Sequence, residues 1–158
     1  MHSSYEMALE IIFIAFISSC ISDEGYAVLK EGDRIPSFIV CSDEGCFSYP
    51  EDINEGKTVL VFIDPMCKDC GAFVPTLNSC SGIIIISRRE DAGALEEFRE
   101  STSLVHPVYY QGGEKAYHSM FSSIVPRVVF IQDGRAVRIY ADPSLPDSDT
   151  INAFLTSD

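Results

Sequence analysis

A hairpin is the first element of the predicted fold. Phe38 and Val40 alternate with polar positions, residues 42–45 (SDEG) have turn composition, and residues 47–49 resume an extended pattern. Folding is expected to begin near Ile35, just before this hairpin. Cysteines at 41 and 46 flank the turn, so the two predicted strands can bring them face to face.

Two later stretches are apolar at nearly every position and rich in β-branched residues. Such runs, here residues 58–63 (TVLVFI) and 82–87 (GIIIIS), are typical of strands covered on both faces. Helical periodicity follows the first run, because apolar residues recur at i, i+3, i+4 and i+7 in Cys70, Phe73, Val74 and Leu77. A buried strand that leads directly into a helix is therefore predicted.

The second half alternates in the same way. Helical patterns occupy residues 92–100 and 114–121, two strands (128–131 and 136–140) flank Asp133–Gly134, and a last helix spans 149–155 with Ser148 or Asp149 as its cap. Strands that alternate with helices and end in an antiparallel hairpin predict an α/β domain. We expect a mixed central sheet with helices on both faces and an N-terminal hairpin.

The N-terminal region resembles an export signal. The apolar run at residues 11–17 is too short to span a bilayer, and Ile17-Ser-Ser-Cys20 resembles the lipobox at which a bacterial lipoprotein is lipidated. No Lys or Arg precedes the run, so the usual positive flank is missing, and a buried N-terminal strand or helix is the alternative. We predict a signal peptide at 1–19, lipidation of Cys20, a tether at 20–33 and one domain at 34–158.

The charge balance excludes one class of partner. The 158 residues include 11 Lys and Arg against 24 Asp and Glu, a formal net charge of -13. Nucleic acids bind by phosphate neutralisation, so we expect no nucleic-acid partner. Anionic lipid would also be repelled, so membrane attachment is expected through a lipid anchor and not through a basic patch.

The six cysteines divide into groups with different predicted roles. Cys20 is the lipidation site, Cys41 and Cys46 form a structural disulfide in the hairpin, and Cys80 behaves as a small buried hydrophobe. Cys67 and Cys70 form a CxxC motif directly after a buried strand and at the start of a helix. Unpaired backbone N–H groups and the helix dipole stabilise a thiolate there. Cys67 at the exposed helix start is therefore the predicted nucleophile, and Cys70, one turn inside, the resolving thiol.

Several segments in order resemble the thioredoxin-like superfamily, and more closely its extracytoplasmic ResA and TlpA type of thiol-disulfide oxidoreductase. They are residues 32–38 as an N-terminal strand, 57–63 before the motif, the motif itself, Pro75 in the following helix, and residues 124–134. Two features depart from the pattern: the chain has no Trp before the motif, and Val61 stands where cytosolic thioredoxins keep a buried acid. The resemblance implies a three-layer sandwich.

The resemblance also implies a mechanism and partners. Cys67 would attack a partner disulfide and Cys70 would resolve the mixed disulfide, with no cofactor. Pro126 would be cis beside the motif, and Val125 would pair its backbone with a bound peptide. The expected partners are protein thiols and disulfides, together with a membrane electron donor if the protein acts as a reductant. The expected location is extracytoplasmic and membrane-anchored, facing the periplasm or the cell surface.

Two other kinds of protein fit part of the pattern. Four thiolates from Cys41, Cys46, Cys67 and Cys70 could form a structural zinc site, although the long aliphatic strands predict a core that folds without metal. A redox-silent thioredoxin fold that only binds partners is the second alternative. His106 and His118 have no paired acid in the sequence pattern, so surface or packing roles are expected for both.

Overall fold

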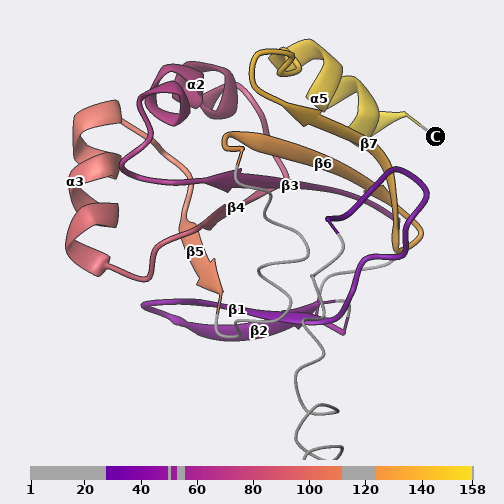
Figure 1. Cartoon of the computed structure of the whole chain (residues 1–158), viewed down its shortest axis with the longest axis horizontal. Coiled ribbons are helices and arrows are strands. Elements are labelled where there is room, and N and C mark those ends of the chain that lie inside the picture. Colours follow the sequence, from indigo (N-terminus) through magenta and orange to yellow (C-terminus); the bar gives the residue numbers. More distant parts are fainter. Residues whose placement is uncertain (1–27, 50, 53–55, 112–123, 158) are drawn as a thin grey trace, which may run out of the picture.

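The computed structural model of the protein describes residues 28–49, 51–52, 56–111 and 124–157. Within this part of the chain, a mixed sheet has the strand order β2-β1-β5-β4-β3-β6-β7 (Figure 1). β3 to β5 are parallel, and the other neighbouring strands are antiparallel. The strands are β1 (Phe38–Ser42), β2 (Gly45–Tyr49), β3 (Lys57–Ile63), β4 (Ile83–Ser87), β5 (Val108–Gln111), β6 (Arg127–Gln132) and β7 (Arg135–Ala141).

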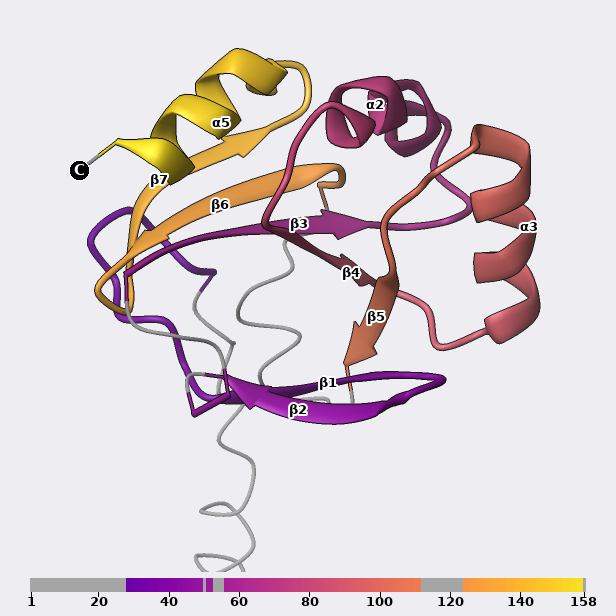
Figure 2. The same ribbon diagram turned by 180° about the vertical axis from the view of Figure 1, so that it is seen from behind.

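Three described helices cover one face of this sheet. They are α2 (Lys68–Asn78), α3 (Ala92–Thr102) and α5 (Ser148–Thr156). Val59, Val61 and Ile63 of β3 lie in one apolar cluster with residues of all three helices. Because alternate residues of a strand face opposite sides, these odd-numbered positions define the helix-covered face. Both views show α2 and α5 on the same side of β3, and α3 at the side of the sheet beside β4 and β5 (Figures 1 and 2).

The opposite face packs against the N-terminal hairpin. Leu60 and Phe62 of β3 share a second apolar cluster with Phe38, Val40 and Tyr49 of β1 and β2. The sheet therefore curves so that its first two strands fold over its own central strands, as Figure 2 shows. The mixed sheet and the N-terminal hairpin are confirmed, whereas the helix predicted at 114–121 lies outside the described residues.

Three features differ from the sequence prediction. β5 was not predicted as a strand, because four residues after Pro107 are too few to show a periodic pattern. Asp147, and not Ser148 or Asp149, caps α5: its carboxylate accepts the Thr150 N–H at 2.8 Å. The helix begins one residue earlier than expected, so the cap moves upstream with it.

The packed fold also begins earlier than the boundary predicted at residue 34. Leu29 is buried in the second cluster, and its carbonyl accepts a hydrogen bond from the Arg127 guanidinium at 2.7 Å. The Gly32 N–H donates to the Ala136 carbonyl at 2.7 Å. Part of the segment predicted as a tether is therefore docked on β6 and β7. Among the described helices, none combines the length and the apolar character that a membrane span needs.

Candidate active site

The turn between β3 and α2 places the CxxC motif at the edge of the sheet. The last five residues of β3 are fully buried, so the strand is fixed in the core up to Ile63. Cys67 is the N-cap residue of α2 and has extended backbone angles, and its side chain makes no capping hydrogen bond. The sulfur is therefore not used to satisfy the helix terminus, and it lies beside the unpaired N–H groups of the first turn.

The two motif cysteines have different environments. Both are free thiols; Cys67 is half-buried, whereas Cys70 is fully buried on the core face of α2. Burial raises the pKa of the Cys70 thiol, and the neighbouring Cys67 adds to this, while a hydrogen bond from the Asp64 N–H acts in the opposite direction. Cys70 is thus held as a neutral thiol, and Cys67 is the sulfur that a partner can reach. Lys68 and Asp69 between them are exposed.

A second loop, directly before β6, meets the motif. The Val125–Pro126 peptide bond is cis. The Cys67 Sγ lies 3.6 Å from the Val125 carbonyl oxygen, within contact for a thiol donor. Met66, directly before Cys67, and Ile124, directly before Val125, are exposed apolar side chains. The structure therefore brings Cys67 into contact with Val125, next to the cis-Pro126, with Cys70 one turn further along α2.

The structure adds a buried acid that the sequence interpretation did not assign. Asp64, directly after β3, is 6% exposed and forms an ion pair with Arg89 at 2.8 Å. The sequence drew attention to Val61, three residues earlier, where the acid of cytosolic thioredoxins is missing. An acidic residue directly after a buried strand was the signal that could have identified Asp64.

The remaining described cysteine and histidine have packing roles. Cys80 is buried in the helix-side cluster, burial raises its thiol pKa, and its Sγ donates to the Thr76 carbonyl at 3.2 Å. His106 is partly buried, with Nε2 2.9 Å from the Leu77 carbonyl oxygen. Neither residue contacts the motif through these bonds. Cys20 and His118 lie outside the described residues.

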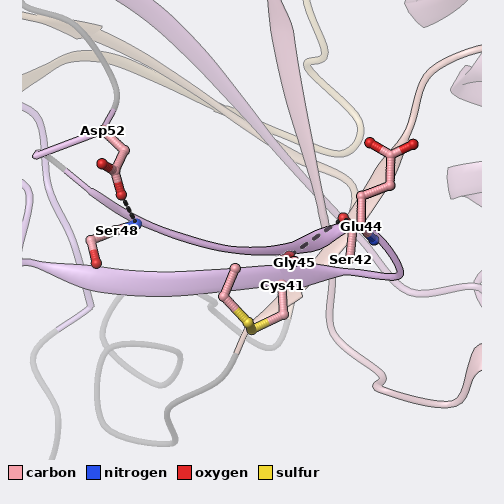
Figure 3. The surroundings of a disulfide bond; sticks show 7 residues. Cys41, Ser42, Glu44, Gly45, Ser48 and Asp52 are labelled. Carbon is pink, nitrogen blue, oxygen red and sulfur yellow. Dashed lines mark hydrogen bonds between the residues drawn. A yellow bond between two sulfur atoms is a disulfide. The ribbon is translucent and has the colours of Figure 1, made fainter.

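The hairpin cysteines form a separate pair. Cys41 and Cys46 are opposite each other in β1 and β2 and are joined by a disulfide (Figure 3). Zinc binds cysteine as a thiolate, and the two hairpin sulfurs are bonded to each other, so this arrangement does not assemble the alternative four-cysteine site. Among the described residues, no group of three or more potential ligands is placed to hold a metal.

Comparison with known proteins gives matches in structure and not in sequence. No protein-family model matches the chain, and no curated protein matches it in sequence. The thioredoxin domain of a thiol-disulfide oxidoreductase from Bacteroides vulgatus superposes with a TM-score of 0.63 at 16% identity, covering 81% of this chain and 99% of that one. This likeness decides the fold. The chain has the thioredoxin-like fold.

Two further structures extend the thioredoxin-like comparison. A secreted Mycobacterium tuberculosis disulfide oxidoreductase, homologous to E. coli DsbE, has a TM-score of 0.59 at 19% identity over 75% of this chain and 93% of its own. StoA from Bacillus subtilis has a TM-score of 0.58 at 15% identity over 77% and 97%. The resemblance seen in the sequence is therefore confirmed at the level of the fold.

Proposed function

We propose that this protein is an exported thiol-disulfide oxidoreductase that exchanges a Cys67/Cys70 dithiol with disulfides of partner proteins. One observation carries the proposal: an accessible thiol at a helix N-terminus lies 3.6 Å from the carbonyl of the residue before a cis-proline, with a second thiol buried one turn inside. The solved structures of this fold named above as oxidoreductases support the same chemistry.

The reaction balances with the two thiols alone. The Cys67 thiolate attacks one sulfur of the partner disulfide, and the partner's other sulfur leaves and takes up a proton. Cys70 then loses its proton and attacks the Cys67 sulfur of the mixed disulfide. The partner leaves as a dithiol, and the chain holds a Cys67–Cys70 disulfide. Two electrons have passed from the protein to its partner, and no cofactor takes part.

Partner recognition would use main-chain groups near the cis-proline. Val125 is half-buried beside Cys67, and its backbone can pair with an extended peptide as an added strand does. Recognition by the backbone accepts many sequences. We therefore propose protein thiols and disulfides as a broad substrate class, with the protein acting as a reductant that a membrane electron donor recharges.

Titration of the dithiol against mixtures of reduced and oxidised glutathione tests this function. The wild-type protein should pass reversibly between dithiol and disulfide forms, with only Cys67 and Cys70 changing state in peptide maps. Cys67→Ser should show no such transition. A wild-type protein whose two motif thiols stay reduced at every glutathione ratio would support the redox-silent alternative instead.

The proposed location depends on Cys20 and the segment before it. If residues 1–19 are removed and Cys20 is lipidated, the protein should fractionate with membranes in the extracytoplasmic compartment. Cys20→Ser should then release it from membranes or leave the precursor unprocessed. Recovery of the wild-type protein in the soluble fraction with residues 1–19 attached would contradict the lipid anchor and leave the exchange chemistry unaffected.

A further inference from the structure

Asp64, which lies outside the CxxC motif, makes hydrogen bonds through both its side chain and its main chain. Its carboxylate Oδ1 accepts the Met66 N–H at 2.9 Å and the Arg89 Nε–H at 2.8 Å. A buried carboxylate without partners would be costly, so these two donors are what allow an acid at this position. Arg89 follows β4, and the ion pair therefore ties the loop after β4 to the turn after β3.

The main chain of Asp64 contacts both cysteines of the motif. Its N–H points at the Cys70 Sγ, 3.5 Å away, and its carbonyl accepts the Cys67 N–H at 2.9 Å. The side chain fixes the turn, and the backbone of the same residue contacts the Cys70 thiol and the Cys67 main chain. Movement of this turn would therefore change the position of Cys70 relative to Cys67.

We propose that Asp64 and Arg89 are positioning residues for the second step of exchange, in which Cys70 resolves the mixed disulfide. This inference rests on the proposed function and adds a role for a site that the CxxC pattern does not include. Arg89 anchors the Asp64 carboxylate, the carboxylate holds the turn, and the turn aims the Asp64 N–H at the Cys70 sulfur. The carboxylate itself does not act as the base for Cys70 in this scheme, since its described contacts go to other donors.

The second step is sensitive to this arrangement because Cys70 must lose a proton inside the core. Burial raises the pKa of the Cys70 thiol. The hydrogen bond from the Asp64 N–H lowers that pKa, and the negative charge of the Asp64 side chain raises it by a smaller amount. The geometry of Asp64 therefore favours resolution while its charge opposes it, and substitutions can separate the two effects.

The test follows the dithiol protein through reaction with oxidised glutathione. Samples quenched in acid and weighed as intact protein show the glutathione adduct on Cys67 forming and then disappearing as Cys70 resolves it. Asp64→Ala removes the anchor of the turn, and we expect resolution to slow by about tenfold or more, so that the adduct accumulates. Asp64→Asn keeps an oxygen for both donors and should resolve at least as fast as the wild-type protein.

The pH dependence of resolution separates positioning from general stability. Asp64→Asn removes the charge and keeps the turn, so its resolution profile should move to lower pH. Asp64→Ala also removes the charge and keeps the main-chain N–H, but it releases the turn that aims this N–H at the Cys70 sulfur. Because that hydrogen bond has the larger influence of the two on the Cys70 pKa, the Asp64→Ala profile should move to higher pH. A purely structural role would not move the two profiles in opposite directions.

Two neighbouring arginines provide a matched control. Arg88→Ala removes the same charge one residue away, at an exposed position whose described bond is a main-chain one to Ile63. Arg89→Ala should slow resolution and Arg88→Ala should not. If Asp64→Ala does not fold, Arg89→Ala carries the test, because the Arg89 side chain is half-exposed and its loss leaves the turn's own hydrogen bond in place.

Two failures can be told apart. The positioning role would be overturned if Asp64→Ala and Arg89→Ala resolved the adduct at the wild-type rate. It would also be overturned if Arg88→Ala and Arg89→Ala slowed resolution equally. Either result would leave the exchange function standing. A wild-type protein that forms neither the glutathione adduct nor a Cys67–Cys70 disulfide would remove the proposed function, and this inference with it.

Discussion

The two described cysteine pairs show how the same side chain serves different purposes in different settings. Cys41 and Cys46 stand opposite each other on antiparallel strands, with α-carbons 4.0 Å apart, and are bonded. Cys67 and Cys70 stand at a strand-to-helix junction as free thiols, one half-buried and one fully buried. Backbone geometry at the hairpin places the two sulfurs of its pair against each other. At the junction it places one sulfur where a partner can reach it.

The surroundings of the two pairs differ as much as their geometry. The hairpin turn is exposed, and short local bonds hold it, such as the Glu44 N–H to the Ser42 hydroxyl (Figure 3). The motif is held by Asp64 in the turn before it, and two distant residues add to this: Arg89 pairs with Asp64, and Val125 contacts Cys67. The motif therefore draws on several elements for its arrangement, whereas the hairpin crosslink needs only its own two strands.

The largest expected difference between the regions is in packing. Leu77 lies fully buried near the C-terminal end of α2, the helix that begins at the motif, and Leu77→Ala should lower the free energy of unfolding by about 2–5 kcal/mol. Ile39 in β1 is about half-exposed, so Ile39→Ala should cost much less. Urea denaturation of both variants measures this. Equal losses at the two positions would mean that the hairpin is as tightly packed as the site.

Removal of the hairpin disulfide should have the next largest effect. The bond closes a very short loop, and the chain-entropy relation gives about 2 kcal/mol for it. A Cys41→Ser/Cys46→Ser double variant should therefore lose about that much stability in urea denaturation. Its rate of exchange with glutathione should not change. A large loss of exchange would show that the two pairs are coupled and would break the comparison.

Sequence patterns predicted the secondary structure better than the contacts between elements. The strands 58–63 and 82–87, the helix after the motif and both hairpins were found because long apolar runs and turn residues are local signals. β5 was missed because it is short, and its pairing with β1 depends on residues far away in the chain. Folding of the first hairpin over the second face of the sheet likewise has no local signal.

The same limit applies to the candidate site. The spacing of Cys67 and Cys70 and their position after a buried strand were local, and the resemblance of residues 124–134 to a cis-proline loop pointed to Pro126. The pairing of Asp64 with Arg89 joins the ends of two parallel strands, and only the fold brings them together. Long-range ion pairs of this kind cannot be predicted without the topology.

The smallest expected effect concerns pH. Burial raises the pKa values of the Cys70 and Cys80 thiols, whereas the bonded hairpin cysteines do not titrate. Stability from these thiols is fully present below the unfolded thiol pKa of about 8.5 and is lost as pH rises toward the folded-state values. The dithiol protein should therefore lose stability above about pH 8.5, and Cys70→Ala should lose it less steeply. Urea midpoints across this range measure both slopes, and identical slopes would contradict the assignment to Cys70.

Acid-quenched trapping of partners by single-cysteine variants tests the central claim most directly. Cys70→Ser keeps the attacking thiol and lacks the resolving one, so mixed disulfides with partner proteins should remain as high-mass bands on non-reducing gels. Cys67→Ser lacks the accessible thiol and should trap nothing. Bands from Cys67→Ser and none from Cys70→Ser would reverse the assigned roles, and the absence of bands from both variants would contradict thiol-disulfide exchange at this site.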